Sequence, residues 1–151
     1  MKIALKYGLI ITAGVVVWVI IAHWLVPNPQ SKVHSLGAGI FFNLLEIVAI
    51  YLGISERKRT AGGSLKFKDA LKTGVSIAFV YGISACLFFL IELLVIGPKL
   101  MQGEMSTSNR PLWQVIVGAF AGLLLGAVVF GLIYSTVIAF VLASRIKASE
   151  S

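Results

Sequence analysis

The sequence of 151 residues has a single cysteine, Cys86, and only 13% of its residues are charged. A lone cysteine excludes an intramolecular disulfide and any metal cluster held by several cysteines. The patterns His-Glu-x-x-His and Gly-x-Ser-x-Gly are missing, as is the glycine-rich phosphate loop. We therefore predict that the chain is not an enzyme and that it carries no cofactor and no metal.

Apolar residues fill most of the chain. Hydrophobic residues make up 58% of the sequence, and the mean hydropathy is +0.96. Soluble domains have roughly one half apolar and roughly one quarter charged residues, so the bilayer is the solvent that fits this composition. The net charge of +7 is explained by the lysines and arginines that membrane proteins gather on their cytoplasmic side. We predict a lipid bilayer as the partner, and no nucleic acid.

Four long apolar runs divide the chain, and each is long enough for the ~20 residues of a transmembrane helix. They predict one all-α domain over 1–151, an integral membrane bundle of four transmembrane helices. The expected spans are about 5–26, 36–54, 70–96 and 112–143. The first run is not followed by a small-residue cleavage site, so we expect an uncleaved span rather than a signal peptide.

The fourth run is too long for one upright span. Its 32 residues would rise about 48 Å, against a hydrocarbon core of ~30 Å. Trp113 and Tyr134 are spaced as interfacial anchors. We expect a membrane part that ends near Tyr134, followed by a projecting end, with a tilted helix as the alternative.

The basic residues favour one side of the membrane. The ten on one side are Lys2, Lys6, Arg57, Lys58, Arg59, Lys66, Lys68, Lys72, Arg145 and Lys147, and the three on the other are Lys32, Lys99 and Arg110. Short loops rich in Lys and Arg stay in the cytoplasm. We therefore predict a multi-pass protein of the bacterial inner membrane with both termini cytoplasmic.

The basic loop between the second and third spans has two interpretations. We expect Gly62-Gly63 to break the chain and Ser64 to cap the next helix. The basic residues could bind anionic lipid headgroups at ~1 kcal/mol each, or they could simply determine topology. The headgroup candidates are Arg57, Lys58, Arg59, Lys66 and Lys68.

The same region resembles a known family. The resemblance is carried by Gly53-Ile54-Ser55-Glu56-Arg57-Lys58-Arg59 and by Gly62-Gly63-Ser64-Leu65-Lys66-Phe67-Lys68-Asp69-Ala70-Leu71-Lys72-Thr73-Gly74, with the start Lys6-Tyr7-Gly8-Leu9 and the later Pro98. These stretches are similar to the bacterial membrane family "domain of unknown function 4199". The resemblance implies a four-span inner-membrane protein and brings no activity.

A glycine stripe marks the fourth span, where Gly118, Gly122 and Gly126 follow one another at intervals of four residues. Such spacing lets a second backbone approach one face of the helix closely. The stripe could pack against glycines of the same bundle, at Gly8 and Gly14 or in the segment 37–39. The alternative is homodimerisation through the stripe.

Glu46 lies near the middle of the second span, and Asn43 lies three residues earlier on the same helical face. A carboxylate at the bilayer centre costs ~2.5–3.5 kcal/mol on insertion scales. We therefore expect Glu46 to face the bundle interior, to be protonated at neutral pH and to bond a neighbouring helix. The pair is either structural glue or a proton or ion site.

Two further polar residues lie near the outer ends of their spans, His23 in the first and Glu92 in the third. Their similar depth allows a pair, and His34 lies in the nearby loop. We do not predict a metal site from these residues, because they lack ligand spacing.

Two functions remain open from the sequence. The first is a non-enzymatic structural or accessory membrane protein that packs with itself or with a membrane-protein partner. The alternative is a small transporter or channel subunit with Asn43 and Glu46 along its path. A hydrated cavity at Glu46 would favour transport, and a tightly packed neighbour would favour a structural role.

Overall fold

A computed structural model describes residues 2–25, 32–97 and 110–147, with only the backbone described at 23–25, 32–35 and 143–147. This part of the chain forms four helices and no strand, which confirms the predicted all-α class. The helices are α1 (Lys2–Leu25), α2 (Lys32–Thr60), α3 (Phe67–Ile96) and α5 (Leu112–Lys147).

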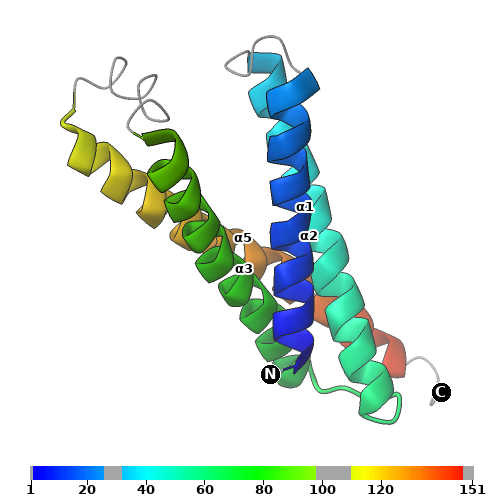
Figure 1. Ribbon diagram of the computed structural model, residues 1–151. Helices are drawn as coiled ribbons and strands as arrows, with labels where there is room; N and C mark the ends of the chain where they lie inside the picture. Colours follow the sequence, from blue (N-terminus) through cyan, green and yellow to red (C-terminus); the bar gives the residue numbers. More distant parts are fainter. Residues whose placement is uncertain (1, 26–31, 98–109, 148–151) are drawn as a thin grey trace.

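The helices form two antiparallel pairs, α1 with α2 and α3 with α5 (Figure 1). The pairs cross at an angle and diverge toward the end of the bundle opposite the chain termini. Helix α3 packs against each of the other three, whereas α1 and α5 do not contact each other within the described residues. Both termini lie at the same end of the bundle (Figure 1), as an even number of spans requires.

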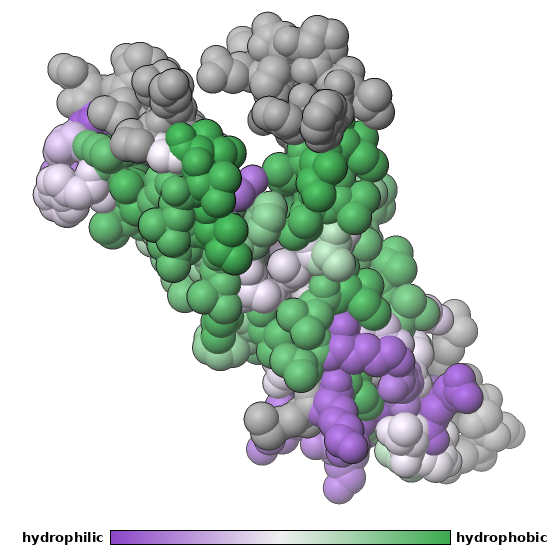
Figure 2. Space-filling view, viewed as in Figure 1, coloured by the Kyte–Doolittle hydropathy of each residue, from purple (hydrophilic) through white to green (hydrophobic). Residues whose placement is uncertain are grey.

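The core lies toward the end that carries the termini. Its largest fully buried apolar side chains are Ile11, Ile50, Ile54 and Ile77. Away from this core many large apolar side chains are exposed on the outer faces of all four helices. Figure 2 shows apolar residues covering most of the bundle's length and hydrophilic ones gathered at the lower end. An apolar exterior of this extent fits a lipid environment.

Each helix contains a segment long and apolar enough to cross a membrane. These segments are Lys2–Ala22, Leu36–Thr60, Phe67–Ile96 and Leu112–Leu142. The predicted spans fall on these helices, but α2 continues six residues beyond the predicted end at 54, through a charged stretch. Glu, Arg and Lys are good helix formers, and the basic residues in the last turn of α2 suit the negative end of the helix dipole.

Helix α5 runs without a break for 36 residues, which corresponds to about 54 Å. Together with α3 it is tilted relative to α1 and α2 (Figure 1). Tilting is one of the two ways in which so long a helix fits a bilayer.

The turn between α2 and α3 depends on two glycines. Gly62 and Gly63 have φ values of 78° and 88°, a conformation that side-chain-bearing residues rarely adopt, so the predicted chain break is confirmed. The predicted cap at Ser64 is wrong. The residue that precedes the helix is Lys66, which has an extended backbone and makes no side-chain capping bond. Ser64 lies two residues before Lys66, so it is too early in the chain to cap the helix.

Candidate functional site

Polar side chains from three helices gather in the bundle. They are Asn43 and Glu46 of α2, Tyr81 of α3, and Tyr134 and Ser135 of α5. The Tyr134 hydroxyl on α5 donates a hydrogen bond to Asn43 Oδ1 on α2. The Asn43 amide nitrogen donates to the Gly39 carbonyl at 2.6 Å, which orients the amide toward α5. Asn43 therefore joins two helices.

Tyr134 makes contacts that its spacing in the sequence did not reveal. Its hydroxyl is bonded to Asn43 inside the bundle, and its ring stacks on Phe130 at a centroid distance of 6.1 Å. Tyr134 is therefore a contact between helices, and its interfacial position stays a prediction. Trp113, the other predicted anchor, is 64% exposed.

Glu46 faces the interior, as predicted, and is only 4% exposed. Its carboxyl lies against the backbone of α5. A Cβ added at Gly131 would stand 3.1 Å from Glu46 Oε1 and would also collide with the Ala78 side chain of α3. Glycine at position 131 therefore creates the space that the carboxyl occupies.

The predicted hydrogen bond from Glu46 to a neighbouring helix is wrong for the described part of the chain. Oε1 is buried there without a hydrogen-bond partner, because Asn43, the expected helper, is already bonded to Tyr134. Tyr81 on α3 and Tyr134 on α5 are close enough to interact electrostatically with Glu46. A buried polar atom without a partner costs on the order of 1–3 kcal/mol, so its presence calls for an explanation.

Ser135 lies one turn after Gly131 on α5, and its hydroxyl is a second buried polar group without a partner among the described residues. The residue is fully buried. The side chain packs toward Gly74 of α3, where an added Cβ would collide with it and would lie 3.1 Å from Ile50 of α2. Sequence analysis did not single out Ser135, because one serine in an apolar run carries little signal.

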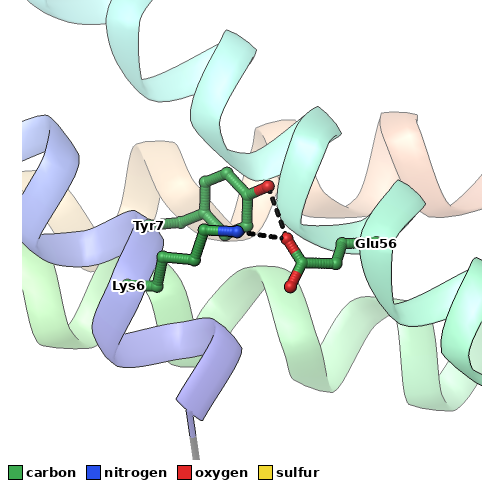
Figure 3. Close-up of polar contacts among 3 residues, drawn as sticks. All are labelled: Lys6, Tyr7 and Glu56. Carbon is green, nitrogen blue, oxygen red and sulfur yellow. Dashed lines mark hydrogen bonds and ion pairs between the residues drawn. The ribbon is translucent and has the colours of Figure 1, made fainter.

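A second polar contact joins α1 and α2 near the chain termini (Figure 3). Glu56 Oε2 accepts a hydrogen bond from Lys6 Nζ at 2.6 Å and from the Tyr7 hydroxyl at 2.7 Å. The Tyr7 ring lies over Gly53, whose added Cβ would be 3.1 Å from it. The segments around residues 6–9 and 53–59, which carry the family resemblance, therefore meet here.

The five headgroup candidates lie in the last turn of α2 and around the start of α3. Hydrophilic residues gather at this end of the bundle (Figure 2). Lys58 differs from the others, because its Nζ donates to the Leu142 carbonyl of α5 at 3.2 Å and helps to hold α2 against α5. Arg57, Arg59, Lys66 and Lys68 are exposed. Their headgroup binding stays a prediction.

The outer polar residues are only partly described. Glu92 is half-buried on α3, while the side chains of His23 and His34 lie outside the described residues, so the predicted His23–Glu92 pair stays a prediction. In the residues described here, no group of three or more His, Cys, Asp and Glu side chains is arranged to hold a metal ion.

The glycine stripe of α5 is open. A Cβ added at Gly118, Gly122 or Gly126 would meet nothing within 4 Å in the described structure. Packing of the stripe against glycines of the same bundle is therefore wrong. Gly8 and Gly14 instead receive Val80 of α3 and Leu45 of α2, and Gly37 and Gly39 have open space around them. Homodimerisation through the stripe stays a prediction.

Comparison with known proteins gives a family and no activity. A family model described as "Protein of unknown function (DUF4199)" matches residues 6–144, which confirms the resemblance found in the sequence. No curated protein and no solved structure matches the chain.

Proposed function

This chain belongs to the DUF4199 family of proteins of unknown function, and we propose that it is a non-enzymatic accessory protein of the bacterial inner membrane that acts through helix packing. The observation that carries the proposal is that polar side chains between the helices form hydrogen bonds from one helix to another. Asn43 bonds Tyr134 across α2 and α5, and Thr12 and Ser84 are hydrogen-bonded across α1 and α3 at 2.6 Å. Such bonds are how membrane helices hold one another.

The surroundings of Glu46 support the same function. Glu46 is 4% exposed and its carboxyl lies against Gly131, which is the tightly packed arrangement expected of a structural residue. The bundle would present its apolar outer faces to lipid and to other spans. The cytoplasmic placement of both termini, inferred from the charge asymmetry, belongs to this proposal.

The test is a search for a stable assembly in mild detergent. Tagged protein is purified after cross-linking in the membrane, and the cross-linked peptides are identified by mass spectrometry. We expect a stoichiometric complex, either with a second copy or with one membrane protein, whose cross-links map to the outer faces of the helices. A chain that stays monomeric under cross-linking and moves a solute in proteoliposomes would contradict the proposal.

The second candidate is a small transporter or channel subunit, and one observation favours it. Glu46 Oε1 is buried without a partner among the described residues, and ionisable groups within membrane spans commonly mark ion or proton pathways. In proteoliposomes, Glu46→Gln should abolish flux if this function holds, while Glu92→Gln, a carboxyl change elsewhere in a span, should leave it. Equal flux through both variants and wild type would exclude Glu46 from a path.

A further inference from the structure

We propose that the Glu46 carboxyl is a reversible proton-binding site within the membrane-spanning part of the bundle. This inference deepens the second candidate function, the transporter or channel subunit. Only the use of the bound proton rests on that function. Binding adds one proton to one carboxylate oxygen and removes one negative charge, and no other bond changes.

The first step of the argument is the absence of a counter-charge. Within the described residues the one ion pair is Lys6–Glu56, at the end that carries the termini, so Glu46 has no cation to balance it. An ionised carboxylate in so apolar a place is expensive. The proton is the ligand that removes this charge without any other group having to move.

The second step concerns the groups that face Glu46 from each helix packed on it. These are Tyr81 from α3 and Tyr134 from α5, both within electrostatic reach, with Asn43 one turn away on α2. Their hydroxyl and amide groups are neutral. Because the Tyr134 hydroxyl is directed to Asn43, the carboxyl is left with a buried oxygen that no described group satisfies.

The third step distinguishes a proton from a metal cation. Ca²⁺ or Mg²⁺ needs about six or more oxygen ligands, and the described residues contain no group of three or more metal-ligating side chains. Asn43 Oδ1, the best neutral oxygen nearby, already accepts a bond from Tyr134. A proton needs only the one carboxylate oxygen.

The fourth step shows that the site is built by its neighbours. Gly131 lets the carboxyl lie against the α5 backbone, and Ser135 supplies a second buried hydroxyl without a partner, one turn along the same helix. Two buried polar atoms without a partner among the described residues therefore lie about one turn of α5 apart.

The experiment is an infrared pH titration of the purified full-length protein, in which the carbonyl stretch of a neutral carboxyl is separate from the band of a carboxylate. At acid pH all six Asp and Glu side chains are neutral, so the informative band is the one that remains at neutral pH, where ordinary carboxyls are ionised. We expect wild type to keep a neutral-carboxyl band at neutral pH and to lose it reversibly at alkaline pH. Glu46→Gln should lose this band, whereas the control Glu92→Gln should keep it. Because no flux is measured, failure here is distinct from failure of the transport candidate.

Three outcomes would overturn the inference. The titrating band could persist in Glu46→Gln, which would place the proton elsewhere. It could be present in wild type but unresponsive to pH, which would make Glu46 a permanently neutral structural group. It could be removed by sodium chloride at constant pH, in wild type and in the control Glu92→Gln alike, which would make a monovalent cation the ligand.

Discussion

The hydroxyl of Tyr134 on α5 donates a hydrogen bond to Asn43 on α2, so that two spans distant in the sequence are joined inside the bundle. A second bond, from the Asn43 amide to the Gly39 carbonyl, holds the acceptor in place. Because α2 and α5 belong to different antiparallel pairs (Figure 1), this contact helps to fix how the pairs cross.

Tyr134→Phe should therefore lower the stability of the bundle by about 1 kcal/mol, the usual scale for an interhelical hydrogen bond in a membrane protein. Thermal unfolding in detergent measures the change, and Tyr51→Phe, at an exposed tyrosine of α2, is the matched control. In a double-mutant cycle, Asn43→Ala and Tyr134→Phe should show coupling. Strictly additive effects of the two changes would mean that the bond contributes nothing.

Two substitutions at Glu46 separate the contribution of its shape to stability from that of its ionisable carboxyl. Glu46→Gln keeps nearly the same shape and polarity, so its free energy of unfolding should stay close to that of wild type at neutral pH. Glu46→Ala removes the packing against Gly131 and should cost on the order of 1 kcal/mol or more. Both are measured by unfolding in detergent. A large loss of stability in the Gln variant would show that the protein needs a carboxyl there.

Much of the fold could be predicted from the sequence, because each span is encoded by its own apolar run. The run at 70–96 lies within the helix Phe67–Ile96, and the break at Gly62-Gly63 was correctly placed. The end of α2 was missed, because hydropathy falls at Ser55 while helix propensity does not. The apolar part of a span and its helix can therefore end at different residues, as they do in α2.

The site was only half predictable for a related reason. The free-energy cost of exposing a carboxyl to lipid can be judged from the apolar run around Glu46 alone. It correctly predicted that Glu46 faces the interior. Its neighbours depend on how helices from different parts of the chain rotate and cross, which no single run specifies. The bond from Tyr134 to Asn43 was therefore missed. The regular stripe at Gly118, Gly122 and Gly126 proved open in the described structure, while less regular glycines such as Gly131 make the close contacts.

Orientation gives a prediction independent of the packing. Ten of the thirteen basic residues fall on the side that holds both termini, and such residues are retained in the cytoplasm. Reporter fusions at the C-terminus should thus be active when the reporter requires the cytoplasm and silent when it requires the periplasm. A fusion in the segment 98–109 serves as the control and should give the reverse pattern. Periplasmic activity at the C-terminus would contradict the assigned orientation.

Two glycines of α5 should differ in their response to the same change. An added methyl group at Gly131 would collide with Ala78 and crowd the Glu46 carboxyl, whereas one at Gly122 would meet nothing within 4 Å in the described structure. Gly131→Ala should therefore destabilise the bundle by about 1–3 kcal/mol, the scale of overpacking in a filled core. Gly122→Ala should be neutral within error, and thermal unfolding in detergent compares the two directly.

The larger substitution Gly122→Leu separates the fold from assembly. Since its side chain would point into open space on α5, the monomer should unfold at the same temperature as wild type. If a second copy uses the stripe at Gly118, Gly122 and Gly126, the leucine would keep the two backbones apart, and cross-linked dimers should decrease. The control is Gly103→Leu, in a loop that lies outside the described residues. Loss of monomer stability in Gly122→Leu, with dimers unchanged, would show instead that the stripe packs within the bundle.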